Sequence, residues 1–193
     1  MILYIHGFNS SPQSFKAQKT TEYIAQLAAA NKDSDLEILV PKVPCYPQQA
    51  FEYIEKLYLE HQDKITGIMG SSLGGYIATY LTEKYQVKSV LINPAVRPYE
   101  LLADHIGPQT NPYTNETYQL TEAHIDELKR FDTPVVKHHS CFWLLQQEGD
   151  EVLDYTQAVD KYQGCRMDVE EGGDHSFIGF ERYLPEIIEF FQV

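Results

Sequence analysis

The amino-acid sequence predicts an α/β fold in which about six mainly parallel strands form one sheet with helices on both faces. Three observations support this fold class. The chain of 193 residues is long enough for a sizeable core, and its composition, 43% apolar and 22% charged, is typical of a globular domain. Short apolar runs alternate along the chain with longer segments of helical spacing. Such alternation requires crossover connections, which build parallel sheets.

Each element is predicted from its hydrophobic period. Apolar runs rich in Ile, Val, Leu and Tyr are expected to form the strands: residues 1–5, 36–40, 65–69, 87–92, 142–146 and 166–170. Segments with apolar residues at every third or fourth position are expected to form the helices: residues 14–29, 47–61, 73–85, 155–162 and 179–191. No repeat or linker divides the sequence, so we expect a single domain over residues 1–193.

One stretch, residues 97–139, interrupts the alternation. It holds four prolines, a Tyr-rich middle and one clear helical segment at 121–130. A long excursion between two strands is often a lid, because the strand ends border the crevice in which ligands bind. The alternative is a surface insertion that has no role in binding. We expect a small lid insertion over residues 97–139.

The charge balance argues against several classes of partner. Fifteen Lys and Arg against 28 Asp and Glu give a net charge of −13. An acidic surface repels nucleic-acid phosphates and anionic membranes, so we expect no nucleic-acid partner and no membrane insertion. The three cysteines have no metal-ligand spacing, and no signal segment is evident. Both observations indicate a cytoplasmic protein with reduced thiols.

The clearest chemical signal is the run Gly70-Ser71-Ser72-Leu73-Gly74-Gly75, which follows a predicted strand and begins a predicted helix. This is the context of a G-x-S-x-G nucleophile elbow, in which a strained turn exposes the serine and small neighbours prevent a clash. The helix N-terminus also favours a developing negative charge. Ser72 is therefore the candidate nucleophile. The alternative is a tight turn built from small residues.

A serine hydroxyl needs a base to take its proton. Of the seven histidines, His175 lies in a glycine-rich loop between the last predicted strand and the last predicted helix. In enzymes with this elbow the catalytic residues follow in the order serine, acid, histidine. We therefore predict that His175 is the base. The alternative is a loop histidine that only caps the helix.

The acid is expected at the end of the preceding strand, which Gly149 interrupts. Asp150 follows this glycine directly, where a side chain can turn inward to orient an imidazole. Asp154 has the position of an N-cap for the next predicted helix. We predict Asp150 as the acid, with Asp154 as the alternative. The acid would fix the tautomer of His175 and stabilise its protonated form.

An oxyanion hole needs two backbone N–H donors. The residue after the nucleophile, Leu73, supplies one of them. The other comes from the loop after an early strand, and His6-Gly7-Phe8 directly follows the first predicted strand. We predict the N–H groups of Phe8 and Leu73 as the two donors and a structural role for His6.

Several motifs together resemble those of the YqiA-type bacterial esterases, a small branch of the α/β-hydrolase superfamily. They extend along almost the whole chain. Four of them lie at residues 4–12, 70–76, 93–102 and 149–155, and begin with Tyr-Ile-His-Gly, Gly-Ser-Ser-Leu-Gly-Gly, Asn-Pro-Ala-Val-Arg-Pro and Gly-Asp-Glu, respectively. The fifth is Gly-Asp-His-Ser-Phe at 173–177. The resemblance implies esterase or thioesterase activity on acyl substrates, with Ser72, Asp150 and His175 matching the triad and no cofactor. It also implies a reduced sheet, because the superfamily's usual first two strands have no counterpart before the His-Gly strand.

These observations together predict a serine esterase. Its expected substrates are small acyl esters, short-chain ones or acyl-CoA thioesters, cleaved through an acyl-enzyme on Ser72. Two other functions stay open: a serine peptidase, and a binding protein that keeps the fold without catalysis.

Overall fold

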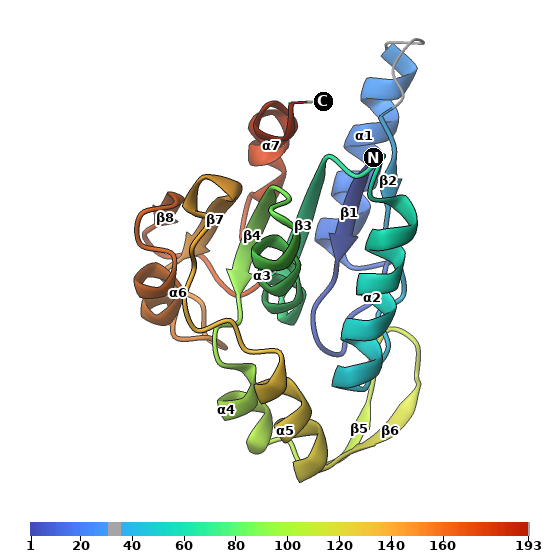
Figure 1. Ribbon diagram of the computed structural model, residues 1–193, viewed down its shortest axis with the longest axis vertical. Coiled ribbons are helices and arrows are strands. Elements are labelled where there is room, and N and C mark those ends of the chain that lie inside the picture. The colour runs from blue at the N-terminus through green and yellow to red at the C-terminus, as the bar shows by residue number, and fades with distance from the viewer. Residues whose placement is uncertain (31–35, 193) are drawn as a thin grey trace.

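The computed structural model describes residues 1–30 and 36–192, and it contains a six-stranded sheet with helices packed around it (Figure 1). The strands of this sheet are β1 (Ile2–Ile5), β2 (Ile38–Leu39), β3 (Gly67–Ser72), β4 (Ser89–Pro94), β7 (Phe142–Gln147) and β8 (Arg166–Glu170). Their order is β2-β1-β3-β4-β7-β8, and neighbouring strands are parallel. The predicted α/β fold with a parallel sheet is confirmed.

The helices largely follow the predicted segments. They are α1 (Phe15–Ala30), α2 (Pro47–His61), α3 (Leu73–Tyr85), α4 (Pro98–Ala103), α5 (Glu122–Arg130), α6 (Tyr155–Lys161) and α7 (Leu184–Phe191). Within residues 1–30 and 36–192, no helix has the length and apolar character needed to cross a membrane.

Four predicted elements differ from the observed ones by two residues or more at one end, and one of these, the strand predicted at 87–92, lies at Ser89–Pro94. The strand predicted at 36–40 is reduced to Ile38–Leu39, because Pro41 follows closely and has no N–H for a ladder. The helix predicted at 179–191 begins as a 3₁₀ turn, Phe180–Tyr183, and becomes α-helical at Leu184. Pro185 suits the first turn of a helix but not its interior. The strand predicted at 65–69 instead continues to Ser72, where it still pairs with β4.

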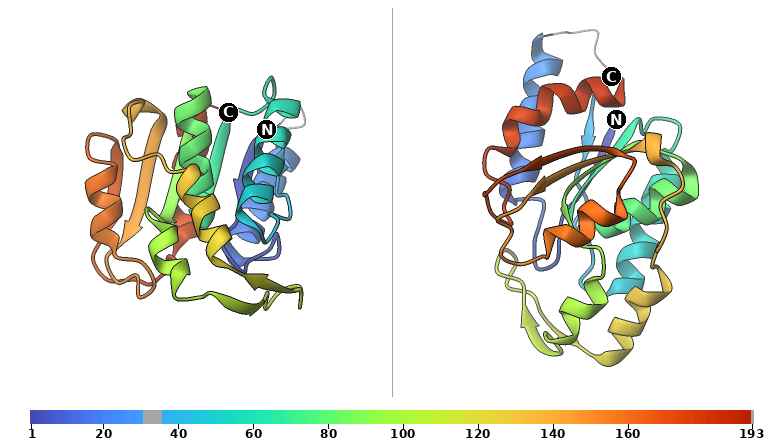
Figure 2. Two further views of the ribbon diagram at one scale, coloured as in Figure 1. Left: turned by 60° about the horizontal axis from the view of Figure 1, so that its bottom comes forward. Right: turned by 90° about the vertical axis from the view of Figure 1, so that its left-hand side faces the viewer.

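Side chains of the inner strands alternate between two separate apolar cores. In β1, Leu3 and Ile5 belong to one core and Ile2 and Tyr4 to the other, and all four are fully buried. Helices α2, α3 and α6 contribute to the first core, and α1 and α7 to the second. Figure 2 shows these two layers of helices on opposite faces of the sheet. Both faces are thus covered, as a parallel sheet requires.

The outer strands of the sheet, β2 and β8, differ from the inner ones. β2 is only two residues long, and β8 carries a charged side chain at every second position. The Arg166 guanidinium lies 3.4 Å from the ring centre of Trp143 in β7. Asp168 accepts a hydrogen bond of 2.6 Å from the indole N–H of the same tryptophan. The charged groups of β8 are therefore engaged by the neighbouring strand.

The insertion between β4 and β7 contains more structure than the one helix predicted for it. Besides α4 and α5 it holds an antiparallel hairpin, β5 (Gly107–Thr110) and β6 (Thr117–Leu120). It lies at the end of the sheet toward which β1 and β4 point (Figure 1). The hairpin was not predicted because its strands are four residues each, and β5, Gly-Pro-Gln-Thr, has no apolar run to mark it.

Helix α3 packs directly against the end of β1 at Gly74. A Cβ atom at this position would lie 2.0 Å from the carbonyl oxygen of Ile5. One at Gly70 would lie 2.5 Å from the carbonyl oxygen of Gly74. These glycines let the helix begin in contact with the sheet, and this close approach positions the turn at Ser72.

We expect Gly74→Ala to lower the free energy of unfolding by on the order of 2 kcal/mol, because a methyl group would overlap the β1 backbone. In a helix without such contact the same change raises stability by about 0.5–1 kcal/mol. Denaturant unfolding of both proteins measures the difference. An unchanged or increased free energy of unfolding would contradict the close approach.

Candidate active site

Ser72 joins β3 to α3 in a strained backbone conformation. Its φ of 55° and ψ of −122° fall in a region that L-residues other than glycine rarely adopt. The register between β3 and β4 shifts at the same point. Gly7, in the loop after β1, lies against the turn: a Cβ there would be 3.0 Å from the Cβ and 3.4 Å from the Oγ of Ser72. The geometry is that of a nucleophile elbow.

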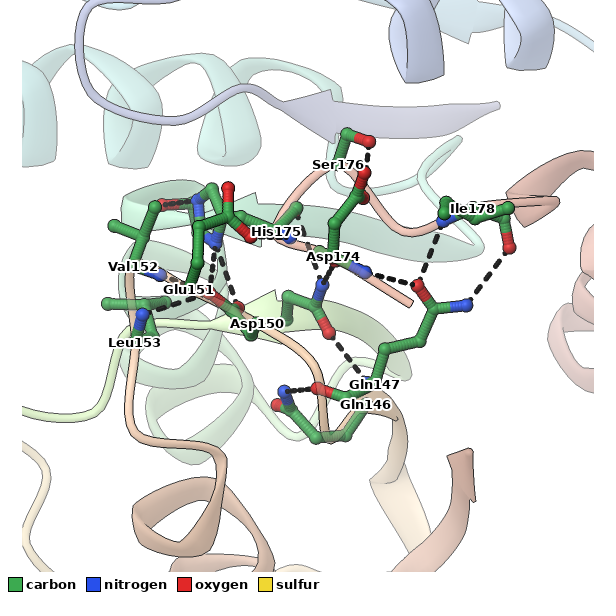
Figure 3. A network of polar contacts seen from close by, with 12 residues as sticks. Gln146, Gln147, Asp150, Glu151, Val152, Leu153, Asp174, His175, Ser176 and Ile178 are labelled. Carbon is green, nitrogen blue, oxygen red and sulfur yellow. Dashed lines mark hydrogen bonds and ion pairs between the residues drawn. The ribbon is translucent and has the colours of Figure 1, made fainter. Parts of the chain in front are cut away.

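His175 and Asp150 meet Ser72 at the carboxyl end of the sheet. Nε2 of His175 lies 3.2 Å from Oγ of Ser72, and Nδ1 lies 2.8 and 2.9 Å from the two carboxylate oxygens of Asp150. Asp150 follows β7 and His175 follows β8, and Figure 3 shows the two side chains pointing toward one another. The structure thus brings together three side chains that the sequence places on three separate loops.

The two candidate acids have different surroundings. The buried side chain of Asp150 accepts two backbone N–H groups of its own loop, each at 2.9 Å, and these bonds orient the carboxylate. Asp154 instead caps α6, where its Oδ1 accepts from the N–H of Thr156 at 3.0 Å and from its hydroxyl at 2.6 Å. Asp150, and not Asp154, contacts His175.

Two buried amide side chains hold the loop that carries His175. Asn93, at the end of β4, donates from Nδ2 to the carbonyl oxygens of Asp174 at 2.9 Å and His175 at 3.2 Å. Its Oδ1 accepts the N–H of Gln147 at 2.9 Å. The Gln147 side chain accepts from the N–H groups of Asp174 and Ile178 and donates to the carbonyl of Ile178 (Figure 3). Neither residue was identified from the sequence; the available signal was an amide side chain near the carboxyl end of β4 and of β7.

Glu170, at the end of β8, completes this network. It accepts from Nε2 of Gln147 at 2.8 Å and from the Tyr183 hydroxyl at 2.6 Å, and it forms an ion pair with Arg182. Desolvation alone would raise the pKa of this carboxyl, but the hydrogen bonds from Arg182, Tyr183 and Gln147 outweigh it and lower the pKa to about 2. The carboxylate is therefore ionised throughout the ordinary pH range.

We expect Glu170→Gln to change how stability depends on pH. Because the folded pKa lies below the ordinary value of 4.5, Glu170 stabilises the fold above that value and loses this contribution as pH falls toward 2. Wild type should unfold at a higher temperature than the variant at pH 6, and the two midpoints should converge near pH 2. Thermal unfolding at a series of pH values measures this. A difference between the two unfolding midpoints that is the same at every pH would contradict the lowered pKa of Glu170.

The predicted oxyanion donors, Phe8 and Leu73, line one small cavity together with Gly7. Leu73 is the first residue of α3, so its N–H has no partner within the helix. The loop that carries Phe8 is held by the hairpin of the insertion. There the Tyr118 hydroxyl donates to Oδ1 of Asn9 at 2.8 Å. The side-chain amide of Asn111, in the turn of the hairpin, donates to the carbonyl oxygen of Ser10.

His6 lies beneath this loop. Its Nε2 accepts the N–H of Val43 at 3.1 Å, and its Nδ1 lies 3.0 Å from the carbonyl oxygen of Gly7. Burial lowers the pKa of the imidazole, which favours the neutral ring that these two contacts require. These contacts are those of a residue that supports the loop.

A cavity of about 310 Å³ lies beside Ser72 and His175. Its other lining residues come from β1, the loop after it, the start of α1, the end of β3, the insertion and the loops after β7 and β8: Tyr4, His6, Gly7, Ser10, Ser14, Phe15, Lys16, Ser71, Tyr113, Glu151 and Ser176. Phe15 and Tyr113 are both half exposed. Tyr113 belongs to the turn of the hairpin, so the insertion borders the cavity.

This arrangement can activate a hydroxyl group. One nitrogen of His175 can take the proton of Ser72 while Asp150 holds the other nitrogen and stabilises the resulting positive charge. Backbone N–H groups near the turn can stabilise a negative charge on a substrate oxygen.

The fold and this geometry are those of the α/β-hydrolase class of proteins. Among solved structures, Est1E from Butyrivibrio proteoclasticus superimposes with a TM-score of 0.67 and 14% identity, over 99% of this chain and 86% of that one. A monoacylglycerol lipase from Paleococcus ferrophilus superimposes with a TM-score of 0.69 and 13% identity, over 98% and 93% of the two chains. At these identities the likeness shows the fold, which is the α/β-hydrolase fold predicted from the sequence.

The chain belongs to the family described as "Uncharacterised protein family (UPF0227)", the YqiA-type family, which matches residues 1–192. A relative of the same family, the UPF0227 protein of Shewanella oneidensis, is 26% identical over 198 aligned positions, which cover 98% of each protein. The family resemblance noted in the sequence motifs is confirmed.

Proposed function

We propose that this protein is a serine hydrolase that cleaves the ester or thioester bond of small acyl substrates. The observation that carries the proposal is the continuous series of contacts from Ser72 through His175 to Asp150, beginning at a strained turn. Esterases and lipases among the proteins of similar fold support it.

In the first half of the reaction, His175 takes the proton of Ser72 as Oγ attacks the acyl carbonyl carbon. The N–H groups of Phe8 and Leu73 donate to the oxyanion that forms. Asp150 stabilises the imidazolium, which then gives its proton to the departing alcohol or thiol. The acyl group stays bound to Ser72.

In the second half, His175 takes a proton from water, and the hydroxide oxygen attacks the acyl carbon. The tetrahedral intermediate collapses when His175 returns the proton to Oγ of Ser72. The products are a carboxylic acid and the free serine.

The size of the cavity supports small substrates. About 310 Å³ is near the lower end of the range of small-molecule sites, which suits short acyl groups. The half-exposed rings of Phe15 and Tyr113 supply apolar contact area for them. We further propose that residues 97–139 form a lid on a single domain, because Tyr113 borders the cavity. A cytoplasmic location remains our expectation from the composition.

We expect Ser72→Ala to lower ester hydrolysis by several orders of magnitude with folding unharmed, since the nucleophile is removed. Turnover of 4-nitrophenyl esters of increasing chain length, and of acyl-CoA thioesters, measures the effect and the acyl preference. Ser71→Ala is the matched control and should retain far more activity. Equal losses in both variants, or persistent turnover without Ser72, would contradict the nucleophile.

Two further experiments separate this function from the two alternatives, a binding protein and a serine peptidase. Covalent labelling of Ser72 by a fluorophosphonate is expected of a serine hydrolase and not of a binding protein. Faster cleavage of peptides than of esters would favour a peptidase.

Asp150→Asn should lower turnover by up to about four orders of magnitude, because the amide cannot stabilise the imidazolium and favours the wrong tautomer. Asp154→Asn should be nearly silent, because Asn caps a helix about as well as Asp. Asp154→Ala should cost about 1 kcal/mol of stability with turnover preserved. Turnover and thermal unfolding of the three variants test both roles. Loss of turnover in Asp154→Asn, with Asp150→Asn near wild type, would reverse the assignment.

A further inference from the structure

One part of the cavity beside Ser72 has no role in the acyl transfer described above. Tyr4 in β1 and Lys16 in the first turn of α1 both line this cavity together with Ser72 and His175. Both carry hydrogen-bond donors. Neither was identified from the sequence, because each lies in a segment with an ordinary strand or helix pattern.

The hydroxyl group of Tyr4 is buried and lacks a partner. The side chain is fully buried, and no group in the part of the chain that the structure describes meets full hydrogen-bonding geometry to this hydroxyl, although the Ser71 hydroxyl lies close enough to act on it. Burial raises the pKa of the phenol, with a smaller opposite effect of Ser71, so the proton is retained and can be donated. Buried hydroxyls in proteins nearly always have a partner. Tyr4 lies in the wall of the cavity, where a bound molecule would supply the missing partner.

Lys16 adds a cation at the same place. Its Nζ donates to the carbonyl oxygen of Ser176 at 2.8 Å, which leaves two of its three protons for other acceptors. It is the only Lys or Arg among the residues that line the cavity. Burial lowers its pKa to about 8, against the opposite effects of Asp174 and Asp150, so at neutral pH the amine is still mainly protonated.

The acidic groups around Lys16 already have other partners. Asp150 contacts His175, Glu151 accepts the backbone N–H of His175 at 2.9 Å, and Asp174 accepts the hydroxyl of Ser176. The first turn of α1 contains no acidic residue, and its free N–H groups add positive potential. Within the described chain no carboxylate forms an ion pair with the Lys16 ammonium, although Asp174 and Asp150 act on it from further away, so an anion bound beside it would supply a direct partner.

We propose that Lys16 and Tyr4 together bind an anionic oxygen group of the substrate, a carboxylate, beside the ester bond that Ser72 attacks. This inference rests on the proposed ester hydrolysis. A carboxylate accepts hydrogen bonds from an ammonium and from a phenol at once, and such charge-assisted bonds are the stronger kind. The preferred substrates are then esters that carry a carboxylate, either on the acyl part or on the leaving group.

Two pairs of esters test which side carries the charge. The pair 4-nitrophenyl hemiadipate and 4-nitrophenyl hexanoate places it on the acyl side. The pair 4-butyryloxybenzoate and phenyl butyrate places it on the leaving group. In wild type, kcat/KM for the charged ester should exceed that for its neutral partner in one pair, and Lys16→Gln should lower this ratio on the order of 10- to 100-fold. Lys19→Gln, one turn further along α1 and half-exposed outside the cavity lining, should leave the ratio unchanged.

Tyr4→Phe removes only the unpartnered hydroxyl. It should lower the same ratio by about 3- to 10-fold, while the midpoint of thermal unfolding stays nearly the same, because within the described chain only Ser71 acts on this hydroxyl, and without full hydrogen-bonding geometry. A fall in the midpoint with no change in the ratio would overturn the part assigned to Tyr4.

Equal losses on the charged and neutral esters in Lys16→Gln would overturn the proposal, since Lys16 would then only anchor the loop through Ser176. Calorimetric binding of monomethyl adipate to Ser72→Ala separates this outcome from failure of the proposed function. Binding that disappears when Lys16→Gln is added supports the carboxylate site even if wild type hydrolyses no ester. Ser72-dependent hydrolysis without any Lys16-dependent preference or binding would refute the carboxylate site and leave the esterase intact.

Discussion

Ser72 adopts a φ of 55°, and the packing that permits this conformation determines where the rest of the site must lie. A strained residue of this kind costs about 1–3 kcal/mol and persists only when its surroundings hold it. Here Gly7 and Gly74 leave room for the turn, and the Ser72 carbonyl accepts the N–H of Ala95 at 3.0 Å. The position of the hydroxyl is therefore fixed by contacts among β1, β3, β4 and α3.

His175 and Asp150, the proposed base and acid, depend on a different kind of support. Asn93 and Gln147 are neutral, and they satisfy the backbone groups of the His175 loop without adding a charge beside Asp150. A charged residue in their place would alter the electrostatics of the imidazole that it positions. Errors of about 1 Å in such geometry can cost two orders of magnitude in rate, so a rigid neutral support suits the site.

Much of this arrangement could be predicted from the sequence because its signals are local. The inner strands and α2, α3 and α6 follow from hydrophobic period, and the order of Ser72, Asp150 and His175 follows from turn chemistry at strand ends. The amides of Asn93 and Gln147 could not be predicted, because their roles depend on which backbone groups the fold brings to them. The hairpin of β5 and β6 could not be predicted either, since β5 has no apolar run and the contacts of the hairpin, such as that of Gln109 with Asn9, join residues 100 positions apart.

The nature of the outer strands has a consequence for the behaviour of the protein in concentrated solution. Exposed strand edges promote aggregation through added β pairing. Here one edge offers only the two residues of β2, and the other, β8, alternates charged side chains that contact Trp143 and other neighbours. Together with a net charge of −13, which makes copies repel one another, these edges disfavour growth of the sheet from chain to chain. The same parallel sheet that supports the site therefore presents edges that disfavour pairing between chains.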